Sequence, residues 1–261
     1  MTHCKNCQQP LATEDNFCRE CGAAVIQHRL TLKYLFQEFY NSFFSIDSSK
    51  PVLTFIDLFK KPEVVIGGYI NGLRKRYIHA FGYFTIAITL SSFFFFIFLK
   101  FFPDLLENAF SYQNEMNAAQ KKMNQEIMQK TFEYQSLIFF ASIPLLSLMA
   151  WIVFFNKRKY NYAENLIIVL YGYSQASIVS VIFYFLTVWN STLFGYATLS
   201  VLIVQIGYFA YIFKRLYKLS IGQLIIKTLF FLAILITIYI VLVITVIIFM
   251  AATGNLQQFA Q

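Results

Sequence analysis

Four cysteines occur in the first 21 residues and nowhere else in the chain, as two C-x-x-C pairs formed by Cys4, Cys7, Cys18 and Cys21. Two such pairs about ten residues apart have the spacing of a tetrahedral zinc site, in which each pair forms a tight turn and the loop between them brings the turns together. The surrounding segment has too few apolar side chains to fold by burial alone, so metal binding must supply folding free energy. We therefore predict a zinc ribbon over residues 1–28 with one structural Zn²⁺. A thioredoxin-like redox pair is the competing interpretation, disfavoured because no βαβ pattern surrounds either pair.

The cysteines also indicate a compartment. Thiolates remain available to zinc only in a reducing medium, and the chain has no other cysteine that could form a structural disulfide. The first ten residues lack the charged start and apolar core of a signal peptide. We expect the N-terminus to be cytoplasmic.

The rest of the chain has the composition of a membrane protein. It is 58% hydrophobic, 19% aromatic and only 13% charged over its whole length, whereas soluble domains contain about 25% charged residues. The apolar residues gather in runs of about 20 or more, the length that a helix needs to cross the hydrocarbon core. We predict an all-α polytopic membrane protein whose membrane domain, residues 78–252, has five transmembrane helices: Ile78–Leu99, Ser136–Phe155, Leu166–Trp189, Leu193–Phe213 and Leu224–Ala252.

The distribution of lysine and arginine predicts how these helices are oriented. Basic loops stay cytoplasmic, and basic clusters precede the first helix, join the second to the third at Lys157–Lys159, and join the fourth to the fifth at Lys214–Lys218. The stretch 103–135 mixes acidic and basic residues, and we expect it to form an outer helical loop. With five spans, the tail at 253–261 then lies outside.

Residues 29–77 do not read as a transmembrane segment. Apolar residues recur at helical spacing from Leu32 to Phe43, which predicts an amphipathic helix on the inner membrane surface. Thr54 is predicted to cap a second short helix. Basic side chains beside such apolar faces favour anionic headgroups, or they serve only to set the topology; these candidates are Lys60, Lys61, Arg74, Lys75 and Arg76.

Two motifs carry a resemblance to a known family. They are Y-I-N-G-L-R-K-R-Y at Tyr69–Tyr77 and N-Y-A-E-N-L from Asn161, and they accompany the double C-x-x-C segment. Together they resemble an uncharacterised bacterial family of zinc-ribbon, multipass membrane proteins, over essentially the whole chain. The resemblance implies this topology in a bacterial cytoplasmic (inner) membrane and no established activity. Gly172-Tyr173 in the third span is similar to Yip-type five-span membrane proteins, which implies a scaffold or trafficking role.

Polar groups within the predicted spans are few. Glu164 and Lys227 lie near predicted cytoplasmic boundaries, where snorkelling accounts for them. We interpret Gln175 and Gln205 as interhelical hydrogen-bonding groups, and substrate contacts of a transporter are the alternative.

The sequence contains no motif of a known catalytic site, so we do not expect an enzyme. The net charge of +8 does not indicate nucleic-acid binding, because Lys5 and Arg19 in the cysteine segment are balanced by Glu14, Asp15 and Glu20. We expect a membrane scaffold or regulatory subunit whose zinc ribbon binds a protein partner or membrane complex, or alternatively a small-solute permease or channel. The expected surroundings are a lipid bilayer, and a homo-oligomer is compatible with the sequence.

Overall fold

The described part of the chain is mostly helical. The computed structural model describes all residues except 1, 5, 13, 14, 16, 24, 26–28, 36–49, 74, 103, 104, 106–126, 128, 129, 132 and 253–261. A short antiparallel pair, β1 (Thr2–His3) and β2 (Pro10–Leu11), begins the chain. The helices are α2 (Lys50–Lys60), α3 (Pro62–Ile70), α4 (Ala80–Phe101), α7 (Gln135–Val153), α8 (Tyr162–Thr187), α9 (Ser191–Tyr217) and α10 (Ile221–Ala252), with a 3₁₀ turn η2 (Phe155–Lys157) after α7.

Five of these helices, α4 and α7 to α10, are long and apolar enough to cross a membrane, which confirms the predicted number. Their ends differ from prediction by up to four residues, where α8 begins at Tyr162 instead of Leu166 and where α9 ends at Tyr217 instead of Phe213. The extra turn forms because Asn161 caps the helix: its side chain accepts the Glu164 backbone N–H. The chain is therefore an integral membrane protein by the length and composition of its helices.

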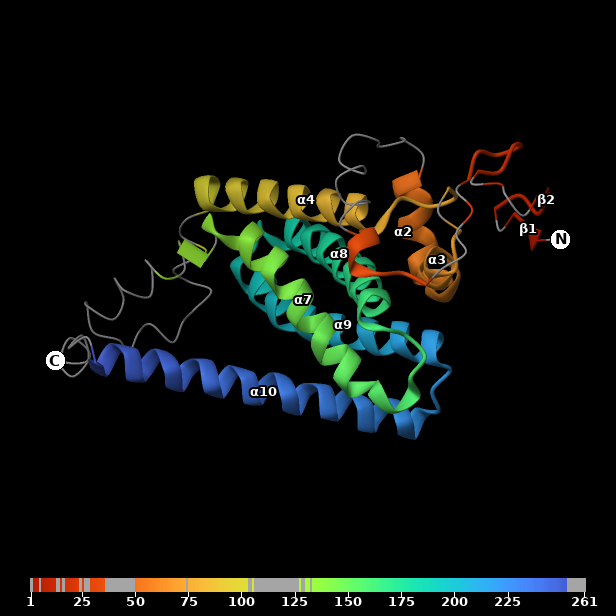
Figure 1. Ribbon diagram of the computed structural model, residues 1–261. Coiled ribbons are helices and arrows are strands. Elements are labelled where there is room, and N and C mark those ends of the chain that lie inside the picture. The colour runs from red at the N-terminus through yellow and green to blue at the C-terminus, as the bar shows by residue number, and fades with distance from the viewer. Residues whose placement is uncertain are drawn as a thin grey trace.

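Helix α8 is the central element of the bundle. It packs against α4, α7 and α9, and 72% of its most apolar stretch is buried by protein, while none of the corresponding stretch of α10 is. Figure 1 shows α7 crossing the bundle from α4 to α10, and α10 running along the outside. This difference in burial shows that α8 is held by its neighbouring helices, whereas α10 is mostly exposed to its surroundings.

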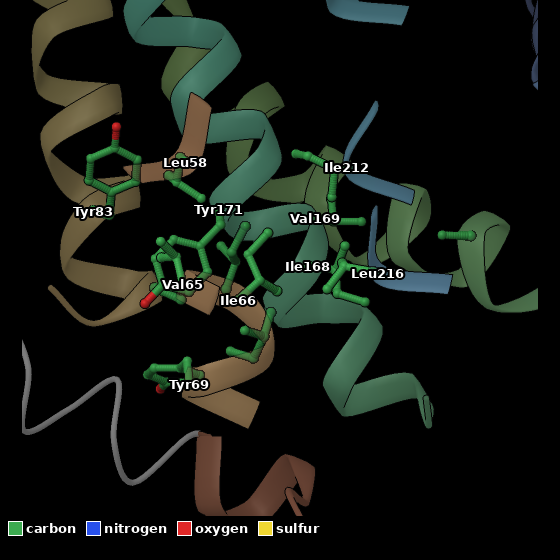
Figure 2. Close-up of a cluster of buried hydrophobic side chains, with 14 of the residues drawn as sticks. Leu58, Val65, Ile66, Tyr69, Tyr83, Ile168, Val169, Tyr171, Ile212 and Leu216 are labelled. Atoms are coloured by element: carbon green, nitrogen blue, oxygen red, sulfur yellow. The ribbon is translucent and has the colours of Figure 1, made fainter. Parts of the chain in front are cut away.

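Helices α2 and α3 pack at the end of the bundle nearest the N-terminus (Figure 1). Leu58 of α2, together with Val65 and Ile66 of α3, is fully buried. Figure 2 shows these side chains meeting those of α4, α8 and α9, with Tyr69 and Tyr171 in the same cluster. This part of the segment predicted to be interfacial is thus built into the core of the bundle.

The predicted cap at Thr54 is wrong. Helix α2 begins at Lys50 with Pro51 in its first turn, where proline is tolerated. Thr54 lies inside the helix and is fully buried; its hydroxyl donates to the Lys50 carbonyl (2.8 Å) and accepts the Ile78 N–H (3.1 Å). The residue therefore joins α2 to the start of α4.

Several predicted features lie outside the described residues. Of the amphipathic stripe from Leu32 to Phe43, only Leu32–Leu35 is described, and it is helical. Arg74, most of the outer loop at 103–135 and the tail at 253–261 are not described.

Candidate metal centre and its attachment to the membrane domain

The four cysteine sulfurs lie together at the N-terminus. All four are within 4.8 Å of one another, with 3.6 Å between the sulfurs of Cys4 and Cys21 and 3.5 Å between those of Cys7 and Cys18. A tetrahedral zinc ion with Zn–S bonds of about 2.3 Å would hold its sulfurs about 3.8 Å apart. The cluster is thus compatible with one metal ion, and the donors fit zinc.

The two C-x-x-C segments form the same backbone turn. In the first, the Cys4 N–H donates to the Gln9 carbonyl (2.7 Å) and the Gln8 N–H donates to the Cys4 carbonyl (2.8 Å). The second turn repeats both hydrogen bonds around Cys18, with Gly22 in the place of Gln8. Gln8 and Gly22 also share a left-handed backbone, with φ of 65° and 60°. The repeat brings four thiols to one point without a large hydrophobic core.

The turns also place hydrogen-bond donors at the sulfurs. The side chain of Asn6 and then the backbone N–H of Ala23 lower the pKa of Cys21 to about 6. The Gln9 N–H favours the Cys7 thiolate, but burial and the neighbouring thiols outweigh it and raise the pKa of Cys7 to about 12. Four sulfurs this close cannot all carry negative charge unless a cation neutralises them. A divalent metal would supply that charge and deprotonate the remaining thiols.

Lys75 connects the cysteine segment to the membrane domain. We call residues 2–25 the head. The Lys75 ammonium donates to the Cys21 carbonyl. A Cβ added at Gly22 would lie 2.9 Å from the Lys75 nitrogen, so a larger residue there would displace the lysine, and glycine also suits the left-handed backbone. Lys75, predicted to face headgroups or set topology, contacts the head instead of being free for lipid.

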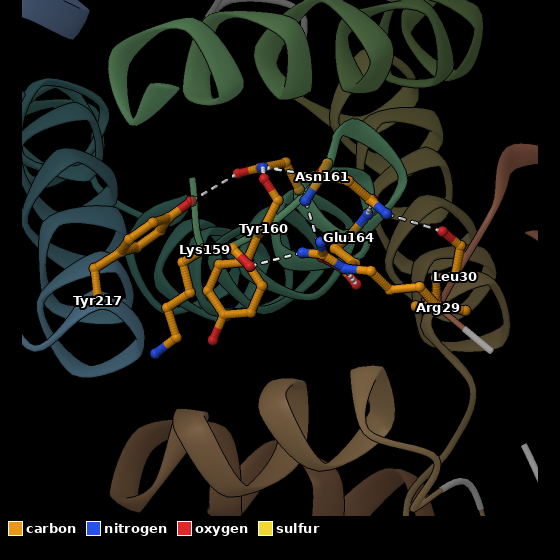
Figure 3. A network of polar contacts seen from close by, with 8 residues as sticks. Arg29, Leu30, Lys159, Tyr160, Asn161, Glu164 and Tyr217 are labelled. Carbon is orange, nitrogen blue, oxygen red and sulfur yellow. Dashed lines mark hydrogen bonds and ion pairs between the residues drawn. The ribbon is translucent and has the colours of Figure 1, made fainter. Parts of the chain in front are cut away.

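A second attachment lies immediately after the head (Figure 3). The Arg29 guanidinium donates to both carboxylate oxygens of Glu164 (2.8 and 2.7 Å) and to the Lys159 carbonyl (2.7 Å). The side-chain amide of Asn161 donates to the Leu30 carbonyl (3.0 Å). The segment leaving the head is therefore fastened to the first turn of α8.

The interpretation of Glu164 as a snorkelling residue is wrong. Its side chain is 3% exposed, it accepts the Asn161 N–H (2.8 Å) to complete a capping box, and the ion pair raises the pKa of Arg29. The sequence indicates the capping box, because N-x-x-E before an apolar run is its pattern. The partner, Arg29, lies 135 positions away and leaves no local signal.

The two predicted interhelical glutamines both have protein partners. The Tyr83 hydroxyl donates to the Gln175 side-chain oxygen, and the Gln175 amide donates to the Phe55 carbonyl of α2 (3.1 Å). Gln175 thereby joins α2, α4 and α8. The Gln205 amide donates to the Ser180 hydroxyl (3.1 Å), which joins α9 to α8.

A polar site at Asp57 was not predicted. This buried carboxylate of α2 accepts the Tyr77 hydroxyl (2.7 Å) and lies 3.4 Å from the Lys61 ammonium. Burial, followed by the hydrogen bond to Asp57, raises the pKa of Tyr77 to about 12. The sequence did contain one signal for this site, because an aspartate on the inward side of an amphipathic helix must have a polar partner.

Two other predicted headgroup residues remain accessible. Lys60 is exposed, and Arg76, also exposed, lies 5.5 Å from the centre of the Tyr77 ring.

The arrangement can hold a metal ion in the head, which Lys75 attaches to the segment before α4, while Arg29 attaches the following segment to α8. Comparisons with models of protein families, with curated proteins and with solved structures find no match to this chain. Its function must therefore be inferred from its own residues and their geometry.

Proposed function

We propose that this protein is a non-enzymatic membrane scaffold or regulatory subunit whose zinc-ribbon head binds a protein partner. The observation that carries the proposal is the bidentate ion pair between Arg29 and the buried Glu164. It fastens the segment beside the metal site to the most buried helix of the bundle. A head held in this way offers a partner a fixed surface at the membrane, which a freely tethered module does not.

Phe17 is the residue of the head best suited to contact such a partner. It directly precedes Cys18 in the chain, and its side chain is 65% exposed. Exposed aromatic side chains on a rigid support are favoured anchors of protein interfaces. The head contains few other apolar groups, so loss of this ring should weaken the interface most.

The permease alternative receives less support. A solute pathway needs polar groups that are free to bind the solute, and Gln175 and Gln205 both bond to other helices. Their contacts favour a role in helix packing.

The proposal also specifies the metal ion, the membrane and the orientation of the chain. We infer Zn²⁺ because four thiolates in a closed tetrahedral set are its characteristic structural ligands. The basic loops favour a cytoplasmic head, and the resemblance to bacterial zinc-ribbon membrane proteins favours the bacterial inner membrane. Cysteine accessibility tests the orientation: Gln120→Cys should react with an impermeant reagent in intact spheroplasts and Arg158→Cys should not, and the reverse result would overturn it.

The partner is tested by affinity purification with cross-linking in native membranes. Wild-type protein should contain about one zinc per chain. The double variant Cys18→Ser/Cys21→Ser should lose the metal and the partner while remaining inserted in the membrane, because membrane helices satisfy their own backbone hydrogen bonds. Phe17→Ala should keep zinc and lose the partner. Arg19→Ala, a change at an exposed side chain of the same head, is the matched control. Stoichiometric zinc in the double variant, or equal recovery of one partner with all variants, would contradict the proposal.

A further inference from the structure

A cavity of about 180 Å³ lies between α7, α8, α9 and α10. Its walls are mostly apolar, and they include Phe209 of α9 and Phe231 and Leu232 of α10. An apolar cavity does not hold water favourably. The group that fits it best is therefore apolar as well.

The length of the cavity matches one leaflet of a bilayer. On α10 its lining runs from Leu224 to Leu235, and on α9 from Leu202 to Phe213. Each of these stretches spans about 16 Å at the helical rise of 1.5 Å per residue, or half of a hydrocarbon core of about 30 Å. Leu202 and Leu235 are also exposed, so the cavity opens to the surface between α9 and α10. An acyl chain could enter from the membrane through this opening.

The end of the cavity nearest the head is positively charged. Lys227 lines it, and its ammonium donates to the Val153 carbonyl and to the Asn156 side chain (2.9 Å). Lys157, which follows Asn156 in the chain, donates to the side chain of Gln223 on the first turn of α10 (3.5 Å). All of these acceptors are neutral. Neither lysine belongs to an ion pair among the residues that the structure describes.

We propose that this cavity binds one acyl chain of an anionic phospholipid from the head-side leaflet, with its phosphate at Lys157 and Lys227. An apolar channel of one-leaflet length selects the chain, and two lysines without acidic partners select the negative headgroup. The site contains no residue of the head, so it does not depend on the proposed partner or on zinc.

Each lysine near an anionic lipid headgroup contributes about a fivefold gain in affinity, so the pair should contribute about 25-fold. The probes are phosphatidylglycerol and phosphatidylcholine with identical chains, titrated into delipidated full-length protein and measured by native mass spectrometry. Wild-type protein should bind phosphatidylglycerol more tightly. Lys157→Gln/Lys227→Gln should remove that preference and leave the weaker binding of phosphatidylcholine.

The apolar part of the site has its own matched pair of variants. Leu232→Trp fills the cavity and should abolish binding of both lipids, whereas Leu229→Trp, on an exposed position of the same helix outside the cavity, should not. Lys100→Gln, at the opposite end of the bundle, should leave the headgroup preference unchanged. If Leu232→Trp does not fold, quenching of Phe231→Trp fluorescence by brominated phosphatidylglycerol, with Trp151 and Trp189 changed to Phe, supplies the same information.

Three results would overturn the proposal. The first is equal binding of the two lipids by wild-type protein. The second is a double lysine variant that loses thermal stability but keeps the headgroup preference, as expected if Lys227 only caps the end of α7. The third is tighter binding of free oleate than of phosphatidylglycerol, which would assign the cavity to a fatty acid.

Discussion

Replacing Arg29 with alanine should release the segment after the head from α8. The substitution removes two charge-assisted hydrogen bonds to Glu164 and one to the Lys159 carbonyl. Such bonds contribute about 1.5–3 kcal/mol each when buried. The Arg29 side chain is 58% exposed, however, so water replaces much of what is lost. We expect a net loss of about 2 kcal/mol, or about a 30-fold larger population of the released segment.

Chymotrypsin cleavage after Leu30 or Leu35 measures that population. Leu30 and Leu35 are almost fully buried and resist cleavage while the segment is attached. When opening and closing are fast, the initial cleavage rate follows the open fraction. The rate should therefore rise about 30-fold in Arg29→Ala. Arg19→Ala, which removes an exposed arginine of the head, should change it less than about twofold.

Two further variants make the reasoning refutable. Glu164→Gln keeps an acceptor for the Asn161 N–H, so its cleavage rate should lie between those of wild type and Arg29→Ala. The double variant Arg29→Ala/Glu164→Gln should be cleaved about as fast as Arg29→Ala, because both changes remove one interaction. If Arg29→Ala and Arg19→Ala were cleaved at the same rate, the ion pair would not hold the segment.

Two other predictions concern stability in detergent. Gln175→Leu should lower the free energy of unfolding by about 2 kcal/mol, because it removes the partner of the buried Tyr83 hydroxyl and of the Phe55 carbonyl. Gln205→Leu should lower it by about 0.6 kcal/mol. Equal shifts of the thermal unfolding temperature in the two variants would contradict this. The hydrogen bond from Arg215 lowers the pKa of Glu63. Its folded pKa lies below the unfolded value of about 4.3, so its contribution is complete above about pH 5 and is lost as the pH falls through the folded pKa. Thermal unfolding between pH 6 and pH 3 should show this loss in wild type and less of it in Glu63→Gln, and identical pH profiles would argue against the assignment.

The sequence predicts the five spans well because the signal is local. A helix that crosses the membrane needs about 20 consecutive apolar residues, and no distant contact changes that count. The same holds for the cysteines, whose spacing alone brings the sulfurs together. Helix α8 begins four residues before the predicted Leu166, because the capping box at Asn161 starts the helix in polar residues that an apolar run does not include.

What the sequence did not predict depends on residues far apart in the chain. Gln175 bonds to Phe55 across 120 positions, and Arg29 bonds to Glu164 across 135. Lys75 shows the same limit: the positive-inside rule accounts for its charge, but nothing in its neighbourhood indicates that it binds the Cys21 carbonyl. A single sequence carries helix propensities and apolar lengths, and it carries no record of which polar groups meet after folding.

The unequal burial of α8 and α10 bears on the order in which the membrane domain assembles during synthesis. Helix α8 brings Gln175 into the bilayer, where it is fully buried against protein. Because chains are made from the N-terminus, α2 and α4, which supply the Phe55 carbonyl and the Tyr83 hydroxyl that bond to Gln175, are already present when α8 leaves the translocation channel. Helix α10 is made last and is the most apolar of the five, with a mean hydropathy of 2.8 against 1.9 for α8. It can insert into lipid without a partner helix. The helix that depends most on contacts with other helices is therefore synthesised after some of its partners, and the helix that depends least on them is synthesised last.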